Sequence, residues 1–140
     1  MIKLKPYAPL FLTLGGLLLV AIGIFFILLR APLLPEDSRY IGTSLSEIEN
    51  KIPGLSAWLQ KVFWVMGCYV LTTGIFTVYI AQTSFRRRVQ GAFVIVFIAG
   101  ITSIGAMTMI NFMLQSDFKW LLLAFTLPWC IALILYQLHK

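Results

Sequence analysis

The residues best suited to chemistry lie between the first two apolar stretches of the chain. Two adjacent acids, Glu36 and Asp37, are followed closely by Arg39 and Tyr40. Such a cluster could bind a lipid headgroup, a metal or a protein partner. It could equally be structural, with the acids paired to Arg30 and Arg39 so that they anchor the loop. Anchoring pairs are common and contribute only about 0–1 kcal/mol each when exposed, and we favour that interpretation.

A metal site or a catalytic centre has little support in the sequence. Two adjacent carboxylates need further ligands to hold a metal, and the only histidine, His139, lies near the C-terminus. Cys68 and Cys130 fall in apolar segments without CxxC spacing. No nucleophile is paired with a base. We therefore predict no catalytic residue and no metal ligand, and the sequence leaves any cofactor unknown.

The elements that position this cluster are membrane helices. Apolar residues make up 60% of the 140 residues and charged residues only 11%, whereas a soluble domain carries about 25% charged residues. A bilayer core of about 30 Å needs about 20 apolar residues in a helix. Four stretches qualify, at about 10–29, 62–82, 91–115 and 118–138. Because irregular backbone cannot face lipid, we predict an all-α fold, a four-helix membrane bundle in one domain over residues 1–140.

The loop at 30–57 is the only sizeable segment outside the spans. Pro32 and Pro35 break the first helix and favour an extended exit. The sequence SLSE at 44–47 has the pattern of a capping box, which predicts a short amphipathic helix. The Pro-Gly pair at 53–54 should end this helix. We expect it to lie on the outer membrane face and to cover the mouth of the bundle.

The basic run Arg86, Arg87 and Arg88 lies in the short linker between the second and third spans. A short, densely basic loop is typical of the cytoplasmic side, where it fixes topology and meets anionic headgroups. The five acids all fall on the opposite side. The net charge of +6 does not indicate nucleic-acid binding, which needs a basic soluble face with aromatic residues. We predict a multi-pass protein with both termini in the cytoplasm.

Polar residues inside the spans are few, and apart from Lys119 at the very edge of the fourth span none of them is Asp, Glu, Lys, Arg or His. Proton pumps and ion-coupled transporters usually carry such groups at depth. Asn111 is the most notable exception to the apolar pattern. An interhelical hydrogen bond is the usual role of such a residue, and a ligand contact beneath the loop is the alternative. Trp64 and Trp129 lie deep and are expected to pack between helices.

Small residues supply candidate packing faces in the second and third spans. Gly67 and Gly74 share one side of the second span, and Gly100 and Ser103 lie in the third. Small residues let helix backbones approach closely in membranes. These faces could serve the bundle itself or a partner, and the sequence leaves both possibilities open.

Two short motifs carry a resemblance to known proteins. Residues 33–42 (LLPEDSRYIG) resemble a segment of small, uncharacterised bacterial four-helix membrane proteins, in which P-x-D-x-x-aromatic-x-Gly follows the first span. Residues 65–69 (VMGCY) are similar to the M-G-x-Y of DoxX-like proteins. The resemblance implies a four-helix fold in the bacterial inner membrane. Because DoxX-like members are linked to quinone-associated oxidoreductase complexes, it also implies an accessory subunit.

Three functions are compatible with these features. The first is a non-catalytic accessory or scaffold subunit that acts through its helix faces and outer loop, as a homo-oligomer or with a partner in a membrane complex. The second is a quinone-reactive or oxidoreductase-associated subunit working near Asp37, Tyr40 and Asn111. The third is a small-molecule or lipid carrier, for which we expect an oligomer because four helices leave little room. The sequence favours them in that order.

Overall fold

The computed structural model describes residues 7–138, which are all-helical and contain no β-strand. His139 lies outside this range. The elements in chain order are α1 (Tyr7–Leu28), α2 (Pro35–Ile41), α3 (Leu45–Lys51), α4 (Leu55–Ile80), the π-helix η1 (Ala81–Phe85), α5 (Ala92–Gly100), the π-helix η2 (Ile101–Gly105), α6 (Ala106–Met113) and α7 (Lys119–Leu138).

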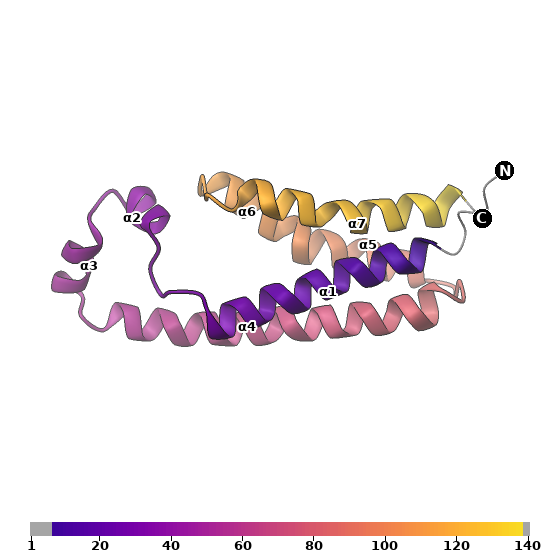
Figure 1. The fold of residues 1–140 in the computed structure, drawn as a ribbon, viewed down its shortest axis with the longest axis horizontal. Coiled ribbons are helices and arrows are strands. Elements are labelled where there is room, and N and C mark those ends of the chain that lie inside the picture. Colours follow the sequence, from indigo (N-terminus) through magenta and orange to yellow (C-terminus); the bar gives the residue numbers. More distant parts are fainter. Residues whose placement is uncertain (1–6, 139–140) are drawn as a thin grey trace.

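Four helical stretches are long and apolar enough to cross a membrane, which confirms the predicted number. They are Tyr7–Leu28, Leu55–Phe85, Ala92–Met113 and Lys119–Leu138. The second begins earlier in the chain than the predicted residue 62, so that α4 projects beyond the end of α1 (Figure 1). Residues 55–61 include polar side chains that a search for apolar stretches passes over. They are helical because their backbone continues the hydrogen-bonded helix of the apolar stretch that follows.

The most extensive helix contact joins α1 to α4 (Figure 1). Glycines from both helices form this contact. A Cβ atom added to Gly23 would lie 2.5 Å from the backbone nitrogen of Leu71, and one added to Gly74 would lie 2.6 Å from the backbone nitrogen of Val20. The two backbones therefore touch, as small residues allow in membrane helices. This glycine face, which includes Gly67, packs inside the chain and is not available to a partner.

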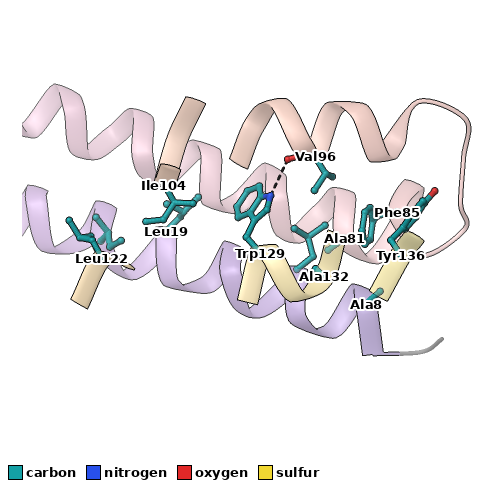
Figure 2. Close-up of a cluster of buried hydrophobic side chains, with 12 residues drawn as sticks. Ala8, Leu19, Ala81, Phe85, Val96, Ile104, Leu122, Trp129, Ala132 and Tyr136 are labelled. Carbon is teal, nitrogen blue, oxygen red and sulfur yellow. Dashed lines mark hydrogen bonds between the residues drawn. The ribbon is translucent and has the colours of Figure 1, made fainter. Parts of the chain in front are cut away.

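The helix α7 closes the other side of α1 and meets α5 through Trp129. The Trp129 side chain is 3% exposed, and its indole Nε1 donates a hydrogen bond of 3.0 Å to the carbonyl oxygen of Val96 (Figure 2). Gly100 lies directly against the same indole ring. The expectation that Trp129 packs between helices is thus confirmed. Trp64 is 47% exposed on α4, so the same expectation was wrong for that residue.

Two π-helical turns interrupt the spans, and neither was predicted from the sequence. They are η1 at the end of the second span and η2 in the middle of the third. A π turn holds more residues than an α turn and often marks a functional site. The turn η2 therefore shifts the face that α6 presents relative to α5. Ser103 lies in this turn.

The loop after α1 contains two short helices where a single one was expected. The extended exit ends at Leu34, and α2 begins at Pro35, a residue that suits the first helical position because it needs no N–H partner there. The carboxylate oxygen Oδ2 of Asp37 accepts a hydrogen bond of 2.8 Å from the Leu34 N–H. Sequence reasoning missed α2, although a proline followed by two acids is a recognisable helix start.

The second short helix, α3, begins after Ser44, whose Oγ accepts the backbone N–H of Glu47 at 3.1 Å. In a capping box the glutamate would also accept a hydrogen bond from the N–H of Ser44, and this second bond is not formed. The Glu47 carboxylate accepts hydrogen bonds from the Thr43 hydroxyl and from Nζ of Lys51 and does not reach back to the Ser44 N–H. A lysine four residues later offers a charged donor, which competes successfully with a neutral N–H.

Candidate functional site

A cavity of about 920 Å³ lies between the α1–α4 pair on one side and η2, α6 and α7 on the other. Ligand sites in proteins have volumes of about 300–1,000 Å³, so this cavity is at the large end of that range. The two groups of helices separate toward the end of the molecule where α2 lies (Figure 1). Trp129, in the middle of α7, holds this helix against α5 beyond the cavity.

The walls of the cavity are mostly apolar and include several aromatic side chains. Each long helix contributes, and the aromatic members are Phe25, Phe26, Phe63, Tyr69, Phe118 and Phe125. Tyr69 is 72% exposed on the α4 side of the cavity, and Ile110 is exposed on the α6 side. Because these residues lie within helices of membrane-spanning length, the cavity opens sideways onto the surface that would face lipid.

The charged residues that line the cavity all lie within residues 30–37, where α1 ends and α2 begins. They are Arg30, Glu36 and Asp37, and all other lining residues are neutral. The segment turns back over the cavity because Pro32 and Pro35 prevent α1 from continuing. The cavity is therefore amphipathic, with its charged groups at the α2 end and apolar walls along the helices.

Arg30 is the cation of this charged end, and its side chain is only 12% exposed. Its Cζ lies 3.6 Å from the ring centroid of Phe63 and 5.5 Å from that of Phe26, an arrangement that stabilises a partly desolvated guanidinium. Its Nη1 donates to the carbonyl of Ala31 at 2.8 Å. Burial lowers the pKa of Arg30 below its ordinary value, and the nearby Asp37 opposes this effect.

The carboxylates of Glu36 and Asp37 bind different partners. Asp37 Oδ2 caps α2 and lies 3.8 Å from Nη2 of Arg30, a distance too long for a strong hydrogen bond. Glu36 instead joins α2 to the connection between α6 and α7. Its Oε1 accepts from the Ser116 hydroxyl at 2.8 Å and its Oε2 from the Asp117 N–H at 3.0 Å. The carboxylate of Glu36 thus holds α2 over the cavity.

Arg39 and Tyr40 were predicted to belong to the same polar site, and the structure places both outside the large cavity. Arg39 is exposed and its Nη2 donates to Asp117 Oδ2 at 2.8 Å. This hydrogen bond raises the pKa of Arg39. Tyr40 is exposed and lines an adjoining pocket of about 190 Å³, which Glu36 and Asp37 also line. Of the predicted cluster, Arg39 is therefore the residue that lines neither pocket.

Asn111 lines the large cavity together with Glu36 and Asp37, and its role as a ligand contact stays a prediction. Its Nδ2 donates to the carbonyl of Met107 at 2.9 Å, one turn earlier in the same helix. The expected bond to another helix is not formed by any residue in 7–138. A hydrogen bond to its own helix leaves the acceptor Oδ1 of Asn111 without a partner among the described residues, half-buried in the cavity wall.

Two residues of the cavity were assigned other roles from the sequence. Ser103 was expected to pack helices together, but it lines the cavity and its hydroxyl donates to the Ala99 carbonyl. Arg30 was considered only as an ion-pair partner. The sequence contained one signal for the position of Arg30 at a helix end. It is a lone arginine just beyond an apolar span, preceded by a pair of phenylalanines and followed by Pro32.

The basic run lies at the opposite end of the molecule, in the turn between η1 and α5. Arg86 and Arg87 are exposed, whereas Arg88 is half-buried. Arg88 Nη1 donates to the carbonyl oxygen of Tyr136 at 3.2 Å, and its Cζ lies 4.5 Å from the centre of the Tyr136 ring. Only two of the three arginines are thus free to meet headgroups.

Residues 7–138 contain no group of three or more His, Cys, Asp or Glu side chains arranged to hold a metal ion. Cys68 and Cys130 are exposed, unpaired thiols on different helices. The resemblance to DoxX-like proteins stays a prediction, and function has to be inferred from the cavity itself. No protein-family model, no curated protein and no solved structure matches this chain.

Proposed function

We propose that this chain is a lipid-binding membrane protein that holds one amphiphilic molecule in its cavity. The headgroup lies at the Arg30 end and the hydrocarbon chain lies between the α1–α4 pair and α6–α7. The observation that carries this proposal is the distribution of polarity: the charged lining residues all come from the single segment 30–37, and the rest of the wall is neutral and mostly apolar.

The physical argument begins with the cavity walls. Lipid tails are as apolar as leucine side chains, so burial of a tail brings little hydrophobic gain inside a bilayer. An apolar space that stayed empty would lose dispersion contacts along its lining. A hydrocarbon chain entering from the side restores those contacts. The headgroup interactions at Arg30, Glu36 and Asp37 then decide which lipid stays bound.

This proposal develops the carrier hypothesis, and one chain is sufficient for it because the cavity forms without a second copy. The accessory-subunit hypothesis stays a prediction with less support, since the faces around Gly67, Gly74 and Gly100 are used within the chain. A homo-oligomer or a partner in a membrane complex would have to bind through the exposed helix surface or the outer loop.

We further infer an inner-membrane location, with both termini in the cytoplasm and the four long helices in one bundle. The described ends of α1 and α7 lie at the same end of the molecule as the 86–91 turn (Figure 1). Exposed arginines in that turn support a cytoplasmic position. The helices α2 and α3 then lie on the outer side, and the charged end of the cavity meets the outer leaflet.

The test is native mass spectrometry of the full chain released from mild detergent. We expect one lipid mass per chain. Ala106→Phe places a large ring in the cavity wall on α6 and should abolish this adduct. Ala124→Phe adds the same ring to an exposed position on α7 outside the cavity, and it should leave the adduct intact. Thermal unfolding of both variants shows whether they are folded.

A folded Ala106→Phe variant that still retains its lipid would contradict the proposal, as would a chain that carries no lipid in any membrane extract. A retained quinone mass, lost in Ala106→Phe, would support the oxidoreductase-associated alternative in the same cavity.

A further inference from the structure

The charges that line the cavity are unequal in number, and this imbalance bears on the identity of the headgroup. One cation, Arg30, faces two carboxylates, Glu36 and Asp37. The lining therefore carries a formal charge of −1, with positive and negative groups side by side. A headgroup that matches this lining has an anionic and a cationic part.

Arg30 provides the anion-binding part of the match. Of its five N–H donors, Nη1 is bonded to the Ala31 carbonyl and Nη2 lies 3.8 Å from Asp37. The guanidinium is fixed in orientation by the Phe63 ring at 3.6 Å, and donors remain for a ligand. A planar guanidinium is well suited to phosphate, which accepts two parallel N–H bonds from it.

Asp37 provides the cation-binding part. Its Oδ2 accepts the Leu34 N–H, whereas no hydrogen bond among residues 7–138 uses its Oδ1. Glu36 is different because both of its oxygens are engaged by Ser116 and the Asp117 N–H. A primary ammonium group can donate to the free oxygen of Asp37. An anionic headgroup without an ammonium would add a further negative charge beside two carboxylates, which Coulomb repulsion disfavours.

We propose that the bound lipid is a zwitterionic aminophospholipid, with its phosphate on Arg30 and its primary ammonium on Asp37. This inference rests on the proposed lipid-binding function and names the ligand class of that site. Such a headgroup has no net charge, so the occupied cavity keeps the formal charge of −1 of its lining. An anionic phosphatidylglycerol would make the occupied cavity more negative.

The experiment is a competition between two lipids that share the same acyl chains. The full chain is delipidated in detergent and incubated with equal amounts of phosphatidylethanolamine and phosphatidylglycerol, and retained lipid is counted by native mass spectrometry. We expect phosphatidylethanolamine to be retained about tenfold over phosphatidylglycerol, which corresponds to about 1.4 kcal/mol. Asp37→Asn should reduce this ratio to near one while adducts persist. Glu49→Gln, at an exposed acid of α3 outside the cavity, should keep the ratio.

The outcomes separate the two proposals. Equal retention of both lipids by the unchanged chain, or a preference for phosphatidylglycerol, would overturn the headgroup assignment and leave the lipid-binding function standing. An unchanged ratio in Asp37→Asn would overturn it as well. Failure to retain either lipid would refute the lipid-binding function itself. Arg30→Gln should weaken retention of both lipids, since each carries the phosphate that Arg30 binds.

Discussion

Arg88 follows two arginines of the same type, and the three are indistinguishable in a count of basic residues. Its guanidinium lies over the Tyr136 ring and bonds the backbone of α7. The Tyr136 ring in turn lies 4.4 Å, centroid to centroid, from that of Phe85 in η1. Arg88 therefore ties the 86–91 turn to the last helix, a structural role in addition to its charge.

Arg88→Ala should consequently destabilise the fold more than Arg86→Ala. Loss of the contact with Tyr136 should cost about 1–2 kcal/mol, the range for a partly desolvated cation over an aromatic ring. Arg86→Ala removes the same charge from the same turn but leaves this contact in place. Thermal unfolding of both variants in one detergent measures the difference. Equal unfolding temperatures would mean that the contact with Tyr136 does not stabilise the folded chain.

At the level of single residues, the sequence showed which residues were unusual but not which residues their side chains would contact. Glu36 and Asp37 were recognised as special because acids are rare in this chain. Their contacts could not be deduced, since Glu36 bonds Ser116 and Arg39 bonds Asp117, residues separated by 80 and 78 positions respectively. Such pairings depend on where the chain returns after α6. Nothing local to the loop encodes them.

Among the elements, the α1–α4 pair has the clearest dependence on sequence. Gly74→Ala would place a methyl group 2.6 Å from the Val20 nitrogen and 2.8 Å from the Gly16 carbonyl oxygen. Both neighbours are backbone atoms, so the helices must move apart. We expect a loss of about 1–3 kcal/mol in the free energy of unfolding, the usual effect of overpacking.

The matched control is Gly54→Ala, because nothing lies within 4 Å of the added Cβ and the φ angle of −87° suits alanine. The free energy of unfolding by denaturing detergent should be unchanged there. If Gly74→Ala were as stable as Gly54→Ala, the close approach of α1 and α4 would be refuted.

The elements were predictable to different degrees for physical reasons. The long helices follow from the cost of exposing backbone polar groups to lipid, a constraint that overrides local propensity. The short helices α2 and α3 depend on single caps, and η1 and η2 on how neighbouring turns pack. Ser44 gave a usable signal for α3. Nothing in residues 101–105 distinguishes a π turn from an α turn before the helix meets α7.

At the scale of the whole molecule, orientation in the membrane is the prediction with the sharpest test. Cys68 and Cys130 are replaced by serine, and a single cysteine is introduced as Glu49→Cys on α3 or Gln90→Cys in the 86–91 turn. Both positions are exposed. A maleimide that cannot cross membranes should label Glu49→Cys on intact cells and should label Gln90→Cys only after permeabilisation. The reverse pattern would overturn the assignment of the termini to the cytoplasm.

The cavity belongs to this scale too, and it was not foreseen. The expectation that four helices leave little room assumes that they pack in parallel contact along their whole length. Trp129 and Gly100 bring α5 and α7 together near the middle of their spans, whereas the Glu36 contacts cross the gap at the α2 end. The separation of the helix pairs is a sum of these packing effects, and no stretch of sequence specifies it alone.

The glycine contact between α1 and α4 also bears on how the protein is made. These two helices precede the α5–α6 and α7 spans in the chain, and the contacts of Gly16, Gly23, Gly67 and Gly74 are all between α1 and α4. The α1–α4 hairpin can therefore assemble before those spans are synthesised, in the order in which nascent chains generally fold. Until α7 arrives, the surface that becomes the cavity wall is open to the bilayer. A lipid can consequently be enclosed as the α5–α6 and α7 spans insert, without having to enter a finished protein.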